Sequence, residues 1–287
     1  MGIIFAVCSM FFAGLTDFFF KKYTDHLQTS LGCFFAGIGL VWATVFAIPL
    51  LIQGQANWHG WPIALAAGLT SILANILLVT ALFRLDAGVG STVYRLNLVL
   101  VPILAAIFLT EPVNAAKMIA ISLGVGAVLL VYQPVGDPLA TLTGRNRFAT
   151  ALPFILLVTA ASIRAVMGLL FKVGANHGVG QYEFLVVTGS CWFAGGILYG
   201  LVSRGRLLPS LRDSRYAITT GLVICGNVLF LALAVKYGEA SVVVPISQLS
   251  FTITILLARV VLHERLTVKR VCALASAVLC IVFMSQA

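Results

Sequence analysis

Long apolar runs fill almost the whole chain, and they constrain its fold more than any other feature of the sequence. A helix that crosses the hydrocarbon layer of a bilayer needs about 20 consecutive apolar residues. Runs of that kind follow one another here with only short polar breaks between them. Lipid offers no partner to backbone N–H and C=O groups, so a spanning segment must be a helix or part of a closed barrel. Because continuous runs lack the alternating pattern of barrel strands, they predict an all-α integral membrane protein.

The runs predict ten transmembrane helices in one polytopic domain. Composition agrees, since 61% of the residues are hydrophobic and only 9% are charged, whereas a soluble domain carries about 25% charged residues. The expected helices are 2–21, 30–52, 62–83, 89–109, 117–133, 151–172, 181–202, 216–235, 241–261 and 270–285.

The two halves of the chain resemble each other when the sequence is shifted by about half its length. FFKKYTDH (19–26) aligns with LFKVGANH (170–177), and LTE (109–111) aligns with LHE (262–264). The polar segment 134–150 is interpreted as a linker between repeats at 1–133 and 151–287. Because five helices is an odd number, the second copy begins on the far side of the membrane. The sequence therefore predicts two inverted five-helix repeats, the usual frame for alternating access.

Loop charge predicts the orientation. Assigning loops alternately to two sides leaves only Lys117, Lys172 and Lys236 on the side that holds both termini. The opposite side holds Lys21, Lys22, Arg84, Arg145, Arg147, Arg204, Arg206, Arg212, Arg215, Arg259, Arg265, Lys269 and Arg270. Since basic loops stay in the cytoplasm, we expect a multi-pass protein of the plasma or inner membrane with both termini extracytoplasmic.

The duplication and its motifs resemble the drug/metabolite transporter superfamily, nearest to its ten-helix EamA-type branch. The resemblance covers essentially the whole chain and includes Glu111 and Glu264 at the end of each half's fourth helix, with ALFRLDAGVGS and ALAVKYGEAS before them. It implies transport of a small metabolite, in a branch known for amino acids, sugars, nucleotide sugars and cations. Many members carry basic residues before the first helix and are taken to have cytoplasmic termini, from which this chain departs.

Three charged residues stand out at depth within predicted helices, where an ionisable side chain costs about 2.5 to 3.5 kcal/mol or more. Asp17 lies late in the first helix and Arg95 about two turns into the fourth, which runs the opposite way, so the two are expected to pair. Either Arg95 binds an anionic substrate group while Asp17 tunes it or carries a proton, or the pair is a structural salt bridge. Arg164 lies midway along the sixth helix. Its guanidinium suits a carboxylate or phosphate of the substrate, with helix packing as the alternative.

Uncharged polar side chains indicate a hydrated cavity in the same region. Asn75 and Asn227 occupy matching places in the third and eighth helices, and Tyr94 adjoins the buried arginine of the fourth. Gln248 and Ser250 lie in the ninth helix. Such groups suit polyols, sugars or amino acids. The alternative is that they bond across helices, the role expected for Asn97.

Other features are expected to be structural. Glu111 and Glu264 each precede a new helix, whose positive N-terminal end a carboxylate stabilises. Small residues four apart, at 122–126 and 273–277, would let the fifth and tenth helices pack closely. Pro245 interrupts the ninth helix, and a kink of that kind supplies a hinge or exposed carbonyls.

These features predict a secondary transporter, gradient-driven or facilitative, that works by alternating access. Two buried arginines against one buried aspartate favour a small polar substrate that is anionic or zwitterionic. Three alternatives stay open: an exporter of cationic or lipophilic compounds that uses Asp17, a membrane-embedded enzyme acting on lipid-linked substrates, and a non-transporting scaffold.

The remaining expectations concern partners. The chain has no nucleotide-binding loop, nucleophile elbow or zinc-protease motif, so we expect no enzyme, cofactor or metal. The +9 net charge is spread thinly over loops and forms no basic stripe, so nucleic acid is not expected. The expected partners are a small polar metabolite, membrane lipids and a coupling proton, and the expected assembly is a monomer or homodimer.

Overall fold

The computed structural model describes residues 1–24, 31–54, 58–82, 94–95, 97–131, 147–203, 211–261 and 267–286. Most of the predicted linker and Glu264 lie outside these ranges. The helices are α1 (Gly2–Thr24), α2 (Leu31–Gln53), α3 (Trp61–Leu82), α5 (Asn97–Phe108), α6 (Ala115–Val131), α7 (Arg147–Asn176), α8 (Gln181–Val202), α9 (Leu211–Tyr237), α10 (Ala240–Gln248), α11 (Phe251–Val261) and α12 (Val268–Ser285).

Ten apolar helical segments account for the described structure. Eight are long and apolar enough to cross a membrane, and two shorter ones cover Asn97–Phe108 and Ala115–Leu130. The eight include α10 together with the first part of α11, which form one interrupted span, Ala240–Leu257. The predicted all-α membrane fold is confirmed.

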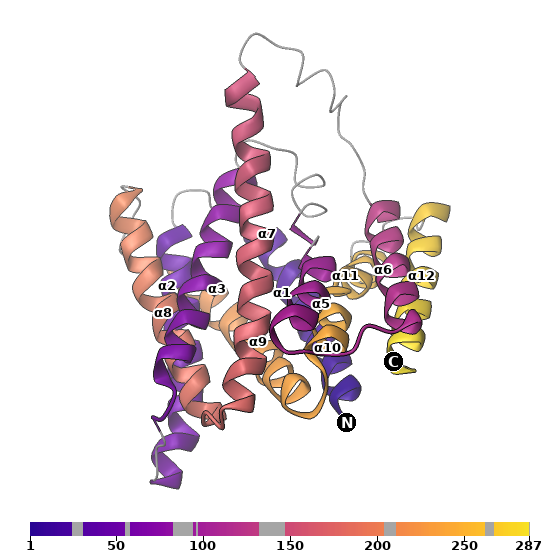
Figure 1. The fold of residues 1–287 in the computed structure, drawn as a ribbon. Coiled ribbons are helices and arrows are strands. Elements are labelled where there is room, and N and C mark those ends of the chain that lie inside the picture. Colours follow the sequence, from indigo (N-terminus) through magenta and orange to yellow (C-terminus); the bar gives the residue numbers. More distant parts are fainter. Residues whose placement is uncertain are drawn as a thin grey trace.

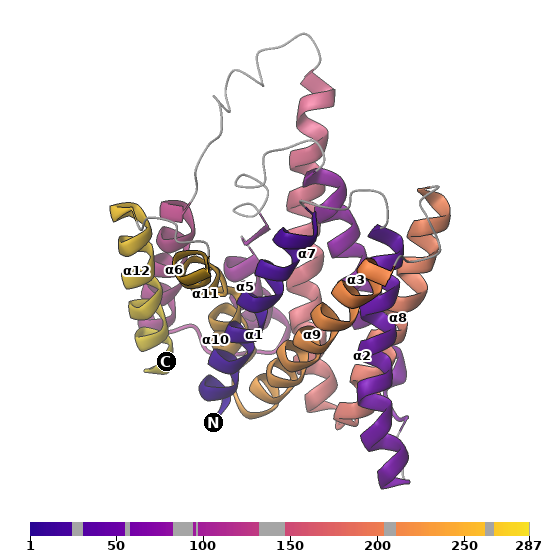
Figure 2. The same cartoon turned by 180° about the vertical axis from the view of Figure 1, so that it is seen from behind.

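The helices pack in pairs that join the two halves of the chain. The four most extensive pairs are α2 with α8, α3 with α7, α1 with α9 and α6 with α12, and α5 also packs on α10. Exchanging each helix for its counterpart in the other half turns α1–α9 into α7–α3 and leaves the other three pairs unchanged. Two inverted copies of one unit produce this exchange symmetry. Figures 1 and 2 show α2–α8 and α6–α12 at opposite flanks, with α1, α5, α10 and α11 between them.

Glycines bring α2 and α8 into backbone contact. A Cβ added to Gly39 would overlap the backbone of Phe193, and one added to Gly196 would overlap the backbone of Ala36. Between membrane helices, close backbone approach replaces the hydrophobic driving force that lipid removes. Close backbone approach and the ring contacts of Trp192 with Phe35 and Trp42 therefore hold this flank together.

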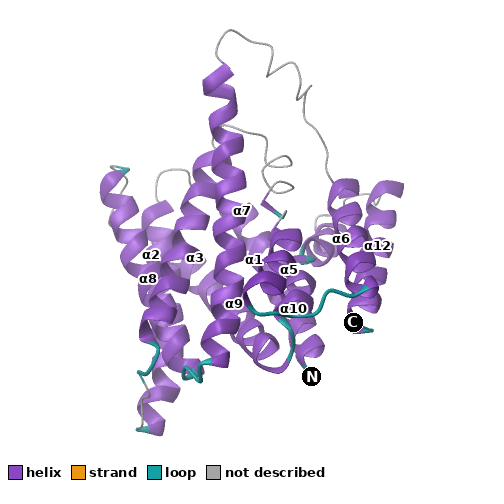
Figure 3. Cartoon of the chain, viewed as in Figure 1, coloured by secondary structure: helices purple, strands orange, loops and turns teal. Residues whose placement is uncertain are grey.

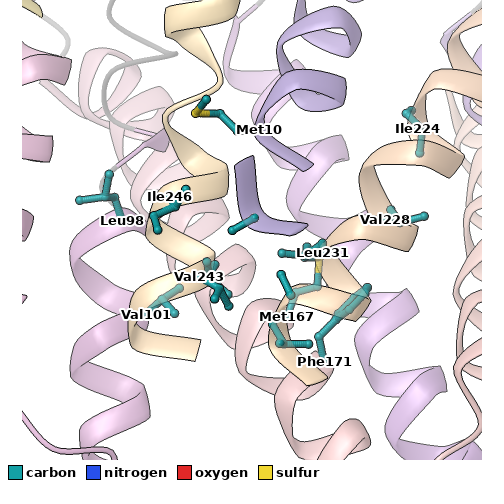
Figure 4. Close-up of a cluster of buried hydrophobic side chains, with 14 of the residues drawn as sticks. Met10, Leu98, Val101, Met167, Phe171, Ile224, Val228, Leu231, Val243 and Ile246 are labelled. Atoms are coloured by element: carbon teal, nitrogen blue, oxygen red, sulfur yellow. The ribbon is translucent and has the colours of Figure 1, made fainter. Parts of the chain in front are cut away.

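The core between the flanks is apolar. Figure 4 shows Val101 and Leu98 of α5 beside Val243 and Ile246 of α10, all of them buried. Met167 of α7 and further aliphatic side chains of α9 complete the cluster. This packing fixes α10 at the centre of the molecule, against helices of both halves.

The ninth predicted helix is interrupted, as expected, but the break lies after Pro245 and not at it. α10 ends at Gln248 and α11 begins at Phe251, with Leu249 and Ser250 in a turn. The N–H groups of Leu249 and Thr252 bond three residues back, to Ile246 and Leu249, instead of four as in an α-helix. Pro245 has no N–H to donate, which weakens the preceding turn. The break falls four residues after that proline.

Two further expectations change. In the fourth predicted helix the described residues are helical at Tyr94, form a turn at Arg95 and are helical again from Asn97, while 83–93 and 96 lie outside the described ranges. Of the small-residue faces, Ala273 and Ala277 are buried, as predicted. Ser122 is instead exposed, and a Cβ added to Gly126 would meet nothing within 4 Å. The 122–126 face therefore lines an open groove of about 420 Å³ at the α6–α12 flank instead of packing on a helix.

Both chain termini lie at one end of the molecule, which we call the terminal end (Figure 1). The loop Leu109–Asn114, teal in Figure 3, joins α5 to α6 at the same end. α9 ends and α10 begins there too, and the start of α1 packs on their connection, since a Cβ at Gly2 would lie 2.9 Å from the Gly238 Cα.

Candidate functional site

The predicted pair of Asp17 and Arg95 is formed, and it lies at the helix break. The Arg95 Nη2 donates to the Asp17 Oδ2 at 2.9 Å. Its Nη1 donates to the backbone carbonyl of Gln248 at 2.6 Å and to the Ser250 Oγ at 3.1 Å. The Ser250 hydroxyl donates in turn to the Asp17 Oδ2 at 3.0 Å. We call these four residues the central cluster.

The break in the backbone explains why the Gln248 carbonyl is available. In a continuous helix that oxygen would accept from the N–H of Thr252. Here Thr252 donates to Leu249, which leaves the Gln248 oxygen for the guanidinium. The Arg95 Cζ also lies 5.3 Å from the centre of the Phe251 ring, a cation–π distance. Arg95 thus ties the start of α5 to the broken span and to α1.

Arg164 extends from α7 toward the same region, and its contacts differ from those of Arg95. Its Cζ lies 5.8 Å from the centre of the Tyr94 ring. The Arg164 Nε and the Tyr94 hydroxyl are both buried, and no hydrogen bond of ordinary geometry reaches either atom from the described residues, although the Arg164 side chain interacts with the Tyr94 hydroxyl. Buried polar atoms are usually paired, so these two atoms would be partners for a further polar group.

Asn97 and Gln248 connect the same region. The Asn97 Nδ2 donates to the Gln248 Oε1 at 3.2 Å, so the expected bond across helices is confirmed. The Asn97 side chain is 1% exposed, and its Oδ1 has no partner among the described residues.

The two matched asparagines make other contacts. Asn75 donates from its Nδ2 to the carbonyl of Ser71 in its own helix at 2.9 Å. Asn227 accepts from the Ser9 hydroxyl at 2.8 Å, which joins α9 to α1. Neither is hydrogen-bonded to the central cluster within the described ranges. Their place in a substrate site stays a prediction.

The structure thus brings Asp17, Arg95, Gln248 and Ser250 into direct contact and places Tyr94 and Arg164 beside each other. The Asp17 side chain is 43% exposed and that of Arg95 16%. The carboxylate is therefore the more exposed partner of the pair. No three His, Cys, Asp or Glu side chains in the described ranges gather as metal ligands.

Comparison with known proteins decides the class of this chain. The model of the EamA-like transporter family matches residues 1–133 and 151–286. This chain belongs to the EamA-like transporter family. It is therefore a multi-pass membrane transporter, and the resemblance noted in its sequence is confirmed.

Two further similarities accompany the family match. An uncharacterized transporter of Archaeoglobus fulgidus is 23% identical over 191 residues, which cover 66% of this chain and 60% of that protein. A crystal structure of another protein superposes with a TM-score of 0.81 at 13% identity, covering 97% of this transporter and 98% of that chain. At that identity the likeness concerns the fold alone.

A second polar cluster, which the sequence analysis missed, lies at the terminal end of the transporter. Lys117 of α6 is 1% exposed and is in contact with the Glu239 carboxylate. Glu111 accepts from the backbone N–H groups of Ala240 and Ser241, both at 2.8 Å. Glu111 therefore does stabilise a helix N-terminus, but that of α10 in the other half and not that of α6, which follows it. The sequence held one signal of this cluster, the acidic residue Glu239 directly before an apolar helix.

Proposed function

We propose that this protein is a secondary transporter, gradient-driven or facilitative, of a small polar metabolite that carries a negative charge, with or without a positive one. Arg164 binds the anionic group. The observation that carries the proposal is the contrast between two partly buried arginines. Arg95 has a carboxylate, a carbonyl and a hydroxyl as acceptors, whereas the Nε of Arg164 has no acceptor among the described residues.

The charge balance supports this assignment. Arg95 and Asp17 neutralise each other at 2.9 Å, so Arg164 contributes an excess positive charge at the site. A buried cation without a counter-ion is costly in a medium of low dielectric constant. A carboxylate or phosphate of the substrate supplies that counter-ion, in the planar geometry that a guanidinium favours. Tyr94 offers its hydroxyl to the same ligand.

Thermal unfolding of the purified protein against a panel of metabolites tests the proposal. A ligand at 100 times its dissociation constant stabilises the folded state by about 2.7 kcal/mol. We expect anionic or zwitterionic metabolites to raise the unfolding temperature of the wild type and of Lys236→Gln, an exposed lysine outside the site. Arg164→Gln should lose that shift. An unchanged shift in Arg164→Gln would refute the assignment.

Export of cationic or lipophilic compounds is the second candidate, and the 43% exposure of the Asp17 side chain favours it. A cation would then displace Arg95 from Asp17. Asp17→Asn should abolish cation efflux in that case, while Arg164→Gln leaves it unchanged. The opposite pattern, with anion binding lost only in Arg164→Gln, rules this candidate out.

We also propose that both termini are extracytoplasmic, in the plasma or inner membrane. The sequence assigns three basic residues to the side that holds the termini and thirteen to the opposite side. Lys172, one of the three, donates to the carbonyls of Val235 and Gly238 at 2.8 and 2.7 Å and is held inside the protein. A cysteine placed at Gln286 should react with an impermeant maleimide in intact cells. Reaction only after lysis would reverse the orientation.

A further inference from the structure

The connection between α9 and α10, residues 237–241, is held from three sides. Lys172 of α7 donates to the carbonyl groups of Val235 and Gly238 at the end of α9. Glu111 accepts from the first N–H groups of α10. Lys117 donates to the Ser241 hydroxyl at 3.0 Å and to the Pro112 carbonyl at 2.6 Å, besides its ion pair with Glu239. Charged side chains therefore bind the last carbonyl groups of α9 and the first N–H groups of α10 at the terminal end.

The two carboxylates lie where helix electrostatics favours them, whereas Lys117 lies in the first turn of α6, where a cation is disfavoured, and depends on its acid partner. Glu111 faces the positive end of α10 with both of its oxygens, satisfying two N–H groups that have no partner within the helix. Lys117 is among the largest side chains that are completely buried. A lysine in that position needs a paired acid, and Glu239 supplies it.

The contacts of Glu111 and Lys117 cross between the halves of the transporter. Both residues precede the 132–146 segment, and their partners Glu239, Ala240 and Ser241 follow it. Lys172, in contrast, bonds only within the second half. A movement of one half against the other at this end must therefore break the contacts of Glu111 and Lys117, while those of Lys172 can persist.

We propose that Glu111 and Lys117 form a latch that keeps the terminal end closed and releases during transport. The proposal rests on the transport function. When the latch opens, water reaches the ammonium of Lys117 and the carboxylates, and their hydration offsets most of the lost attraction. An ionic latch of this kind opens at a lower cost than a tightly packed apolar contact of equal area, because an apolar contact gains nothing from water.

Chemical accessibility behind the latch tests the proposal without any substrate. Val244, one turn into α10, is 3% exposed, and Val244→Cys serves as the reporter. Cys191, 7% exposed between α3 and α8, is kept as a reporter of global unfolding, and the other native cysteines are replaced. The full-length protein in proteoliposomes is treated with an impermeant maleimide from the terminal side. Labelling rates are compared in wild type, Lys117→Met, Glu111→Gln and Lys236→Met.

We expect Lys117→Met and Glu111→Gln each to raise the labelling rate of Val244→Cys about tenfold or more, the factor that corresponds to 1.4 kcal/mol in the closing equilibrium. Lys236→Met, at the same end but outside the latch, should leave it unchanged. Cys191 should stay unlabelled in every variant. Equal labelling of Val244→Cys in latch variants and wild type overturns the proposal. Parallel labelling of Cys191 overturns it too, because the residues then maintain the whole fold.

The outcome is independent of the proposed anion site, because no ligand enters the measurement. Loss of the ligand-induced thermal shift in Arg164→Gln, with unchanged labelling in the latch variants, would keep the transport proposal and remove the latch. Faster labelling in the latch variants, with an unchanged thermal shift in Arg164→Gln, would keep the latch and remove the anion site.

Discussion

Two ion pairs of the transporter differ in how the cation is buried and held. In the central cluster the acid is the accessible partner, with Asp17 43% and Arg95 16% exposed. At the terminal end the acid is again accessible, with Glu239 41% exposed, but its partner Lys117 is almost completely buried at 1%. Arg95 is further held by a backbone carbonyl that a helix break has freed. The Asp17–Arg95 pair thus lies at a break in a helix, whereas the Glu239–Lys117 pair lies at the N-terminus of α10.

The difference teaches what each pair can do. A planar guanidinium that bonds to three acceptors fixes the geometry of the helices around it. An ammonium is a compact charge on a flexible stem, which can leave one partner for water with little rearrangement. We therefore assign Arg95 to positioning the site and Lys117 to closing an end, and the variants below test that division.

Arg95→Met should have the largest effect on stability. It removes three hydrogen bonds, leaves the Ser250 hydroxyl and the Gln248 carbonyl without the guanidinium donor, and leaves Asp17 with the Ser250 hydroxyl as its donor. We expect the free energy of unfolding to fall by about 3 kcal/mol, less than for a fully buried pair because Asp17 is accessible. Unfolding in detergent measures it. Adding Asp17→Asn should cost little more, and fully additive losses would show that the two side chains are not coupled.

Glu111→Ala should come next. Two N–H groups of α10 lose their acceptor, and the positive end of the helix loses its carboxylate. A lost cap of this type costs about 1–2 kcal/mol. The same unfolding measurement applies, with Glu111→Gln as the conservative partner that keeps one acceptor oxygen. If both substitutions were neutral, Glu111 would not stabilise α10.

Lys117→Met should affect stability less than either, by about 1 kcal/mol. The methionine fills much of the same space, and Glu239 can be hydrated because it is 41% exposed. Its effect on the accessibility of Val244 should nevertheless be large. A loss of 3 kcal/mol or more, equal to that of Arg95→Met, would erase the distinction between the two ion pairs.

Asn227→Ala should have the smallest effect, about 0.6 kcal/mol, the average for a hydrogen bond between membrane helices. It removes the acceptor of the Ser9 hydroxyl and touches neither ion pair. Ligand-induced thermal shifts measured on this variant decide whether Asn227 also belongs to the substrate site. An abolished shift would place it there, whereas a retained shift leaves it as a contact between α1 and α9.

Apolar run length was enough to predict the helices, because membrane insertion depends on local composition. Matching depths in antiparallel helices were enough to pair Asp17 with Arg95. The break after Gln248 was harder to predict, since Pro245 marks a weakened turn without fixing where the chain unwinds. The partners of Glu111 and Lys117 could not be predicted, because they depend on which helix ends meet across the two halves. Asn75 and Asn227 match in sequence but have different local partners, Ser71 and Ser9.

Flux through reconstituted proteoliposomes tests the central claim most directly. The metabolites that stabilise the wild type are loaded on one side, and their rate of appearance on the other is compared for wild type, Arg164→Gln and Lys236→Gln. Losing a charge-assisted hydrogen bond of about 1.5–3 kcal/mol predicts an anion flux at least tenfold slower in Arg164→Gln. The flux of the control Lys236→Gln should equal that of the wild type. Anion flux at the wild-type rate in Arg164→Gln would contradict the account.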